Sequence, residues 1–343
     1  NICYGTAPSE LSFDIASSGA DGNFTYLWEE STDGLNYGAS TQSNTTTTYQ
    51  AESLVQTTYY RAQVSSVYGC GTETTSAVTI NVYAPLNPGL IGSSQDICYD
   101  SAPLAHSLIL PAIGADGNYS YIWEESIDSL NFTPATQFNT NTNYQAEDLS
   151  LSNYYRLEIS SDYGCGTVYT NVIKDSVYNE LTAPVISSAQ SICYASTPDL
   201  LTMDIAATGG GDISYFYEWQ KSLNGSSWNG LGVYGPAIQP VNLTTSTYYR
   251  LSAISSFVCG PIYSDPVYIE VYTPLESGVI TSSQDICYGT VSDELNFEVG
   301  PTGADGDYTY LWEQSLNGFD YSDANMYNAS INYQSEFLFE SFY

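Results

Sequence analysis

The chain has very few basic residues. Of its 343 residues, 5 are Lys or Arg and 38 are Asp or Glu, which gives a formal net charge of −33. Proteins that bind nucleic acid without sequence preference do so through clustered cations that displace counterions. We therefore expect no nucleic acid among the partners. An anionic lipid surface would repel the chain in the same way.

Long apolar runs and the usual groups of catalytic residues are scarce too. No run approaches 18 apolar residues, so we expect no membrane insertion, and the first residues do not read as a signal peptide. The single His has no Ser–His or Cys–His partner set, and no Gly-rich phosphate loop is found. The pairs Glu29-Glu30 and Glu124-Glu125 cannot converge on one bond, because adjacent strand residues point to opposite faces. We expect neither an enzyme nor a cofactor.

The chain contains an internal repeat, which its seven cysteines reveal. Their spacings alternate as 67, 28, 67, 28, 66 and 28 residues, which gives a period of about 95. A Trp follows the first cysteine of each repeat by 25 or 26 residues. We define four repeats from this register: 1–83 (without its first strand), 84–178, 179–272 and 273–343. The last repeat ends before its second cysteine, so the chain reads as a window from a longer array.

Apolar and aromatic residues alternate with period two inside each repeat, which is the period of a strand. Phe24, Tyr26 and Trp28 illustrate this on one strand, and the other repeats keep the pattern. About seven short strands per repeat with a Trp on a middle strand predict an immunoglobulin-like sandwich. The expected fold is therefore all-β, a tandem array of such sandwiches whose short Pro-containing joints extend it into an elongated rod. The core should include the residues Trp28, Trp123, Trp219, Trp312, Tyr60, Tyr155 and Tyr249.

Cysteines at fixed positions in successive repeats indicate disulfides and an oxidising, extracellular setting. We expect one bond within each repeat, with Cys287 left unpaired because its partner would lie beyond the last residue. The expected pairs are Cys3–Cys70, Cys98–Cys165 and Cys193–Cys259. A competing pattern joins neighbouring repeats through Cys70–Cys98 and Cys165–Cys193.

Each complete repeat has one Arg in the motif Tyr-Tyr-Arg, namely Arg61, Arg156 and Arg250. We interpret these as structural ion pairs on a sheet face, with Glu29 opposite Arg61 and Glu124 opposite Arg156. The alternative interpretation places each Arg in a ligand pocket with its tyrosines.

The motif Gly-Ala-Asp-Gly precedes the Trp strand in three repeats and predicts a tight turn. Its carboxylates could also bind Ca²⁺, a hard cation that prefers oxygen ligands. The candidate metal ligands for weakly bound Ca²⁺ are Asp21, Asp116, Asp305 and Asp307.

The recurring Ile-Cys-Tyr, Tyr-x-Trp-x-x-Ser with a following Asp-Gly, and Thr-Thr-Tyr-Tyr-Arg resemble a known repeat type. They are similar to the Ig-like or PKD-like repeats of very large secreted surface proteins of Bacteroidota, including gliding-motility adhesins exported by type 9 secretion. The resemblance implies an extracellular, cell-surface stalk, with surface anchoring or secretion machinery as partners. It also implies O-glycosylation within Asp-Ser-hydrophobic triplets, at Ser101, Ser129 and Ser176.

Three functions follow from these observations. In the first, the repeats pack on one another as a structural stalk or filament of an adhesin and project an adhesive or motility-related tip. In the second, each repeat is a module that binds carbohydrate or protein, with surface glycans contacting exposed tyrosines such as Tyr37 and Tyr68. In the third, the chain is the subunit of a self-assembling surface filament.

Overall fold

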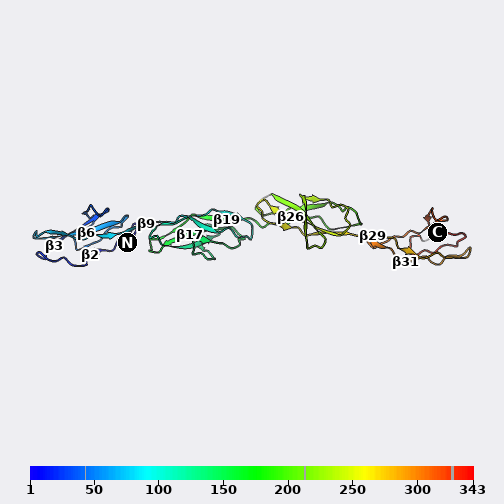
Figure 1. Ribbon diagram of the computed structural model, residues 1–343, viewed down its shortest axis with the longest axis horizontal. Coiled ribbons are helices and arrows are strands. Elements are labelled where there is room, and N and C mark those ends of the chain that lie inside the picture. Colours follow the sequence, from blue (N-terminus) through cyan, green and yellow to red (C-terminus); the bar gives the residue numbers. More distant parts are fainter. Residues whose placement is uncertain (43, 212–213, 326–327) are drawn as a thin grey trace. The chain divides into compact units, whose positions relative to one another are not determined.

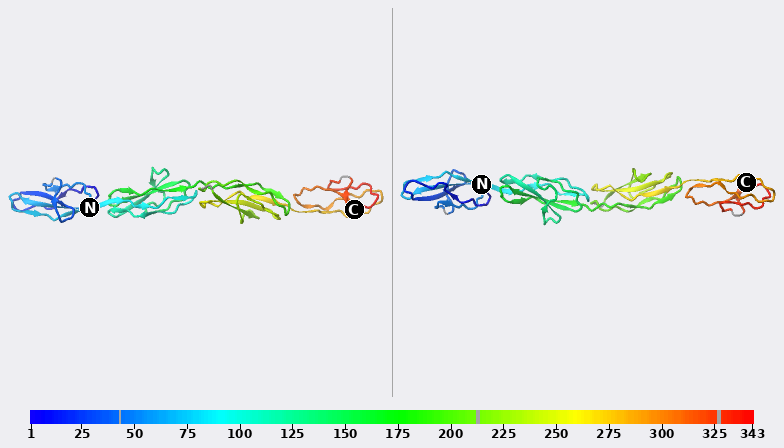
Figure 2. Two further views of the ribbon diagram at one scale, coloured as in Figure 1. Left: turned by 90° about the horizontal axis from the view of Figure 1, so that it is seen from above. Right: turned by 90° about the horizontal axis from the view of Figure 1, so that it is seen from below.

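The computed structural model describes residues 1–42, 44–211, 214–325 and 328–343, and these residues form strands, turns and loops without a helix. No helix among them could span a membrane. The chain divides into two units, Asn1–Asn179 and Glu180–Tyr343. Each unit contains two repeats (Figures 1 and 2). Repeats 1 to 3 are two-layered β-sandwiches, whereas the described residues of repeat 4 form three two-stranded sheets. The all-β fold of tandem immunoglobulin-like sandwiches is thus confirmed.

Repeat 2 shows the sandwich most fully. One sheet has the order β10-β12-β16, and the other has the order β11-β19-β17-β14-β15, with β18 also paired to β17. The strands are β10 (Leu90–Ile91), β11 (Gln95–Ile97), β12 (His106–Leu110), β14 (Tyr119–Ser126), β15 (Thr133–Pro134), β16 (Asn143–Tyr144), β17 (Asn153–Ser161), β18 (Thr167–Tyr169) and β19 (Ile173–Val177).

Repeats 1 and 3 follow the same plan. In repeat 1 the strands are β1 (Ile2–Cys3), β2 (Leu11–Ser12), β3 (Phe24–Ser31), β4 (Gly38–Ala39), β5 (Thr48–Tyr49), β6 (Thr58–Ser66), β7 (Thr72–Thr74), β8 (Val78–Ile80) and β9 (Val82–Asn87). In repeat 3 they are β20 (Val185–Ile186), β21 (Gln190–Ile192), β22 (Leu201–Ile205), β23 (Tyr215–Ser222), β24 (Asn229–Tyr234), β25 (Ala237–Ile238), β26 (Thr247–Ser255), β27 (Ile262–Tyr263) and β28 (Val267–Val271).

The direction of the short strand at the first cysteine determines at which end of the sandwich that cysteine lies. In repeat 1, β1 runs parallel to β9, with Ile2 opposite Val82 and Cys3 opposite Tyr83. Strands β11 and β21 pair with β19 and β28 in the same way. The first cysteine therefore lies at the end of the sandwich where the last strand leaves. We call this the leaving end, and the opposite end the receiving end.

The cores confirm most of the predicted buried residues. Trp28, Trp123 and Trp219 are buried, as are Tyr60, Tyr155 and Tyr249. Each Trp strand alternates between the core and the outer face, and pairs along its length with a strand beginning at the Tyr-Tyr-Arg motif. The large rings meet at centroid distances of 5 to 6 Å, as with Trp123 and Tyr144 at 5.7 Å.

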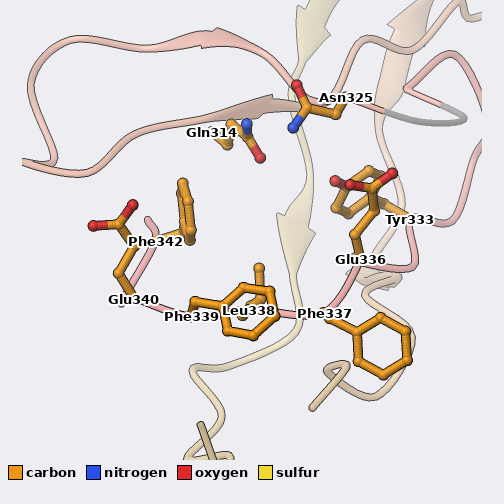
Figure 3. A pocket seen from close by; sticks show the side chains of 9 residues that line it. All are labelled: Gln314, Asn325, Tyr333, Glu336, Phe337, Leu338, Phe339, Glu340 and Phe342. Carbon is orange, nitrogen blue, oxygen red and sulfur yellow. The ribbon is translucent and has the colours of Figure 1, made fainter. Parts of the chain in front are cut away.

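Trp312 in repeat 4 is an exception, because it is only half-buried. It stacks on Tyr333, but the described residues of this repeat contain no counterpart of β6, β17 or β26 to cover it. Phe337, Phe339 and Phe342 line a shallow pocket nearby (Figure 3). The strands of repeat 4 are β29 (Thr273–Glu276), β30 (Val279–Ile280), β31 (Phe297–Val299), β32 (Thr302–Ala304), β33 (Glu313–Gln314) and β34 (Ser322–Asp323).

Candidate functional site: the junction between repeats

A disulfide joins repeat 1 to repeat 2. Cys3, at the end of β1, is bonded to Cys165, which is 162 positions away in the sequence, and the two Cα atoms are 5.2 Å apart. Cys165 lies in the tight turn between β17 and β18, where the flanking Gly164 and Gly166 have φ angles of 84° and 102°. Such angles favour glycine, so the sequence Gly-Cys-Gly places the thiol at the tip of the turn.

Tyrosines surround this bond. The hydroxyl of Tyr163 donates a hydrogen bond of 2.6 Å to the backbone carbonyl of Asn1. Its ring meets the ring of Tyr83 edge-on, with the centroids 5.1 Å apart. Edge-to-face pairs of this kind contribute about 0.5–1.5 kcal/mol beyond the apolar area that they bury. The junction therefore combines a covalent bond with specific packing.

The joint between the two repeats is itself a strand. Strand β9 ends repeat 1 (Figure 1). It continues to pair antiparallel with β13 (Ile113–Ala115) of repeat 2, with Ala84 opposite Ala115. A Cβ on Gly114 would lie 2.0 Å from the carbonyl oxygen of Pro85. Glycine is thus required at Gly114 for this close approach of two backbones.

The motif Gly-Ala-Asp-Gly therefore does more than make a turn. Its first two residues form the edge that receives the joint strand, and β32 in repeat 4 receives β29 in the same way. A Cβ on Gly303 would lie 1.9 Å from the carbonyl oxygen of Pro274. Sequence reasoning missed this role, because a Gly-Ala-Asp-Gly that only makes a turn has the same sequence as one that also receives a strand.

The predicted disulfide pairing within repeats is wrong. Cys3 is bonded to Cys165 and not to Cys70, and this excludes Cys98–Cys165 as well. Cys193 is free, so Cys193–Cys259 does not form. Cys98 and Cys259 are each disulfide-bonded. Cys70, Cys193 and Cys287 are free and exposed, so neither bond of the competing pattern forms either.

The physical reason is that the two cysteines of a repeat lie at opposite ends of the sandwich. Cys3 lies beside Tyr83 at the leaving end, whereas Cys70 lies in the turn that precedes Thr72 at the receiving end. From Thr72 to Tyr83 the chain runs mainly through β7, β8 and β9, and eleven extended residues span about 36 Å. A disulfide needs Cα atoms within about 7 Å.

The ion pairs on the outer sheet face are confirmed in two repeats. Arg61 Nε contacts Glu29 Oε2 at 2.7 Å, and Arg156 Nε contacts Glu124 Oε2 at 2.6 Å. In repeat 3, Gln220 occupies the position of the carboxylate, so Arg250 instead donates a hydrogen bond of 2.8 Å to its amide oxygen. The prediction of an ion pair at Arg250 is therefore wrong.

Aromatic rings also pack against the guanidinium groups of these three Arg residues. The guanidinium carbon of Arg61 lies 3.9 Å from the ring centroid of Tyr37. That of Arg156 lies between Phe132 and Tyr169, and that of Arg250 lies between Trp228 and Tyr263, at 3.7 to 4.2 Å. Cation–π contacts and the polar partner together fix each Arg on the sheet.

The aspartates proposed as Ca²⁺ ligands make local hydrogen bonds. Asp21 accepts one from Ser66, and Asp116 accepts from Ser161 and Asn118. These bonds lower the pKa of Asp116, chiefly through Ser161. Asp305 accepts a hydrogen bond of 3.2 Å from the backbone N–H of Asp307. The described residues contain no group of three or more His, Cys, Asp or Glu that could hold a metal ion.

The three serines of the proposed glycosylation triplets lie in different surroundings. Ser129 is exposed in a turn, with a φ angle of 62°. Ser101 is half-buried in a bridge to Leu149, and Ser176 is half-buried within β19, opposite Asp96. A modifying enzyme would reach Ser129 most readily.

A buried polar pair in repeat 2 was not predicted from the sequence. His106 Nε2 lies 2.8 Å from Asp175 Oδ2, and both side chains are almost fully buried, beside Trp123 and Tyr155. The other oxygen of Asp175 has no hydrogen-bond partner among the described residues. The two residues are 69 positions apart, so nothing local in the sequence connects them.

These features define a class of protein: an array of tandem immunoglobulin-like β-sandwich repeats with strand and disulfide junctions. The chain belongs to the family described as Domain of unknown function (DUF8696), whose model matches residues 1–84, 87–179 and 182–273. No curated protein is similar to the chain in sequence.

Several solved structures are similar at low identity. Three N-terminal domains of the Highly Immunogenic Outer Capsid protein of bacteriophage RB49 are 10% identical, with a TM-score of 0.37, covering 78% of this chain and 95% of that one. Extracellular domains 3–5 of Drosophila OTK are 12% identical, with a TM-score of 0.32 and coverage of 79% and 93%. Domains A168–A170 of titin are 14% identical, with a TM-score of 0.33 and coverage of 79% and 94%.

Proposed function

We propose that the chain is the structural repeat region of a secreted cell-surface adhesin, a stalk that projects an adhesive or motility-related tip. The observation that carries this proposal is the disulfide between Cys3 and Cys165. It joins two successive sandwiches, so it strengthens the connection between them. A stalk has to transmit force from one repeat to the next, and a covalent bond between repeats serves that purpose.

The bond joins two residues that lie 162 positions apart, so it closes a large loop of the chain. Tension that enters at Cys3 passes directly to Cys165, so the residues between them, which include repeat 1 and most of repeat 2, need not unravel for the load to be carried. A chain stapled in this way resists lengthening even if its strands separate. Disulfides within single repeats would leave the joints as the weakest points.

The surroundings of the exposed tyrosines favour a stalk over a module that binds sugars. The ring of Tyr37 is covered on one side by Arg61. Tyr163, the counterpart of Tyr68 in repeat 2, packs on Tyr83 in the junction. Both tyrosine positions named as sugar contacts thus have structural neighbours in this fold.

The setting of this stalk is part of the proposal. Disulfides form and persist in oxidising compartments, which supports an extracellular location. The high negative charge would keep neighbouring stalks apart and soluble. Export by type 9 secretion, attachment by surface anchoring machinery, glycosylation and weak Ca²⁺ binding are further expectations that accompany the resemblance and the acidic surface.

Stretching single molecules of the whole chain by its two ends tests the load-bearing role. The fully reduced chain should extend about 560 Å or more beyond the oxidised chain, since the bond bypasses 162 residues of about 3.5 Å each. The oxidised double variant Cys3→Ser/Cys98→Ser should extend as far as the reduced chain.

The matched control is Cys193→Ser/Cys287→Ser, which removes two free thiols and should leave the extension of the oxidised chain unchanged. Equal extension of the oxidised and reduced chains would contradict the load-bearing role. Retention of the whole chain on surface polysaccharide, with no such difference in extension, would favour the binding module instead.

A further inference from the structure

The receiving end of repeat 2 shows which groups of one repeat bind the repeat before it. Gly114 and Ala115 pair with the joint strand β9, while Tyr163 and Cys165 hold the end of β1. The occupant is thus the leaving end of the preceding repeat, with a short cysteine-bearing strand and a joint strand side by side. In repeat 4, β32 receives its preceding strand β29 in the same register.

Repeat 1 has the same receiving surface, and no described strand pairs with its edge. We define this surface as Gly19–Gly22 together with Tyr68–Gly71. Gly19 has a φ angle of 100°, close to the 94° of Gly114, and a Cβ there would meet no atom within 4 Å. Ala20 has a φ angle of 49°, against 48° for Ala115 and 49° for Ala304. The edge is therefore formed before any strand is bound.

The side chains of this surface are equally unoccupied. Tyr68 is 78% exposed, whereas its counterpart Tyr163 is 49% exposed. Cys70 is a free, exposed thiol in the position of Cys165. One carboxylate oxygen of Asp21 is buried with no hydrogen-bond partner among the described residues. The backbone edge, the ring, the thiol and the carboxylate all lie at one end of one sandwich.

We propose that this surface binds the leaving end of another repeat of the same family, placed directly before repeat 1 in a polypeptide. The inference rests on the proposed structural role and names the partner of that site. The joint strand of the preceding repeat pairs with Gly19-Ala20. The tyrosine of that strand that corresponds to Tyr83 packs on Tyr68, and the first cysteine of the preceding repeat bonds to Cys70. We choose a preceding repeat as the occupant because both filled receiving edges described above hold the strand that precedes them.

The covalent step needs an oxidant, which we name as a small disulfide such as oxidised glutathione. The thiol of Cys70 and the incoming thiol lose two protons and two electrons and form one S–S bond. The glutathione disulfide takes up the two electrons and two protons and leaves as two thiols.

The test extends the chain at its N-terminus with a second copy of residues 1–95, which keeps the period of 95 because Asn1 then follows in register. The extended chain is refolded with glutathione, digested with trypsin without reduction, and mapped by mass spectrometry. The Cys3 peptide of the added copy, residues 1–61, should be linked to residues 62–156 of the original chain, through Cys70. Chymotrypsin, which cleaves at Tyr83, then separates Cys70 from Cys98.

Thiol counting gives a second readout. The chain has three free thiols, at Cys70, Cys193 and Cys287. The extended chain gains two cysteines and one bond, so it should still have three free thiols. The variant Cys70→Ser in the original copy should have four, because Cys3 of the added copy then has no partner. A free Cys70 in the original copy, a bond within the added copy, or a bond between two molecules would overturn the proposal.

This outcome is separable from that of the stretching experiment. If Cys70 stays free while the oxidised chain still resists extension, the inference fails and the load-bearing role stands. If Cys70 of the original copy is bonded but the oxidised and reduced chains extend equally, the docking surface stands and the load-bearing role fails.

Discussion

Repeat 2 differs from its neighbours at two buried positions that contact one another. His106 takes the place of Leu11 and Leu201, and Asp175 takes the place of Ile80 and Ile269 in the corresponding strands. Repeats 1 and 3 thus have two apolar residues at these positions, and repeat 2 has a hydrogen-bonded polar pair. A carboxylate is unexpected on a buried strand, and the hydrogen bond to His106 accounts for Asp175 at this position.

This exchange gives a prediction about the stability of repeat 2. His106→Leu alone would leave the buried carboxylate of Asp175 without its partner and should destabilise the repeat by about 3–5 kcal/mol. The double variant His106→Leu/Asp175→Ile restores the pair found in repeat 3, and should be as stable as the natural repeat or up to about 4 kcal/mol more stable. Amide hydrogen exchange of β14 and β17 measures the change repeat by repeat.

The single variant Leu201→Ala in repeat 3 serves as a control, because it should weaken repeat 3 without changing the exchange of repeat 2. If the effects of His106→Leu and Asp175→Ile simply add, the two side chains are not coupled and this account of the pair is wrong.

Replacing the carboxylate of Glu124, beside Arg156, with a neutral amide should change the stability of repeat 2 only slightly. Repeat 3 already has the neutral amide of Gln220 at this position, where it accepts a hydrogen bond from Arg250. Glu124 is buried, but Arg156 lies partly in solvent and an amide oxygen can still accept its hydrogen bond, so we expect Glu124→Gln to cost less than about 1 kcal/mol. Hydrogen exchange of β17 is the measurement, and a loss of several kcal/mol would show that the charge itself holds the sheet face together.

At the scale of elements, the joint strand distinguishes this array from sandwiches connected by flexible linkers. Strand β9 is shared, since it pairs with β1 in its own repeat and with β13 in the next. Gly114 makes this sharing possible. The joint is therefore part of the hydrogen-bonded structure of both repeats.

A pair of glycine substitutions isolates the joint. Gly19→Ala and Gly114→Ala both place a side chain at positive φ, which should cost about 1 kcal/mol or more in each case. Only the Cβ at residue 114 would overlap the backbone of the joint strand, at Pro85, which should add about 1–3 kcal/mol. Hydrogen exchange of the amides of β9 and β13 should rise in Gly114→Ala and stay unchanged in Gly19→Ala; equal effects would contradict the role of Gly114.

The elements could largely be predicted from the sequence. Alternation with period two locates the Trp strand and its partner, because each residue of such a strand faces either the core or the solvent. The pairing of Arg61 with Glu29 followed from the same register. The edge formed by Gly114 could not be foreseen, because Asp-Gly in a turn and a glycine beneath a crossing strand have the same sequence.

At the scale of the whole molecule, the pairing of the cysteines decides what kind of array this is. Each complete repeat has two cysteines, which lie at its opposite ends in the structure, but their spacing in the sequence does not tell which of them meet. The missing information was that β1 runs parallel to β9, since this direction carries Cys3 away from Cys70 and towards the next repeat. Short parallel pairings over two residues leave no trace in a hydrophobic pattern.

The most direct test uses the scarcity of basic residues. Trypsin cuts the chain only after Arg61, Arg156, Lys174, Lys221 and Arg250, so Cys3 and Cys165 fall in the separate peptides 1–61 and 157–174. Digestion of the oxidised chain without reduction should yield these two peptides as one disulfide-linked species, which dithiothreitol separates. Peptide 1–61 linked instead to peptide 62–156 would mean that Cys3 is bonded within its own repeat or to Cys98, and would contradict the junction on which this account depends.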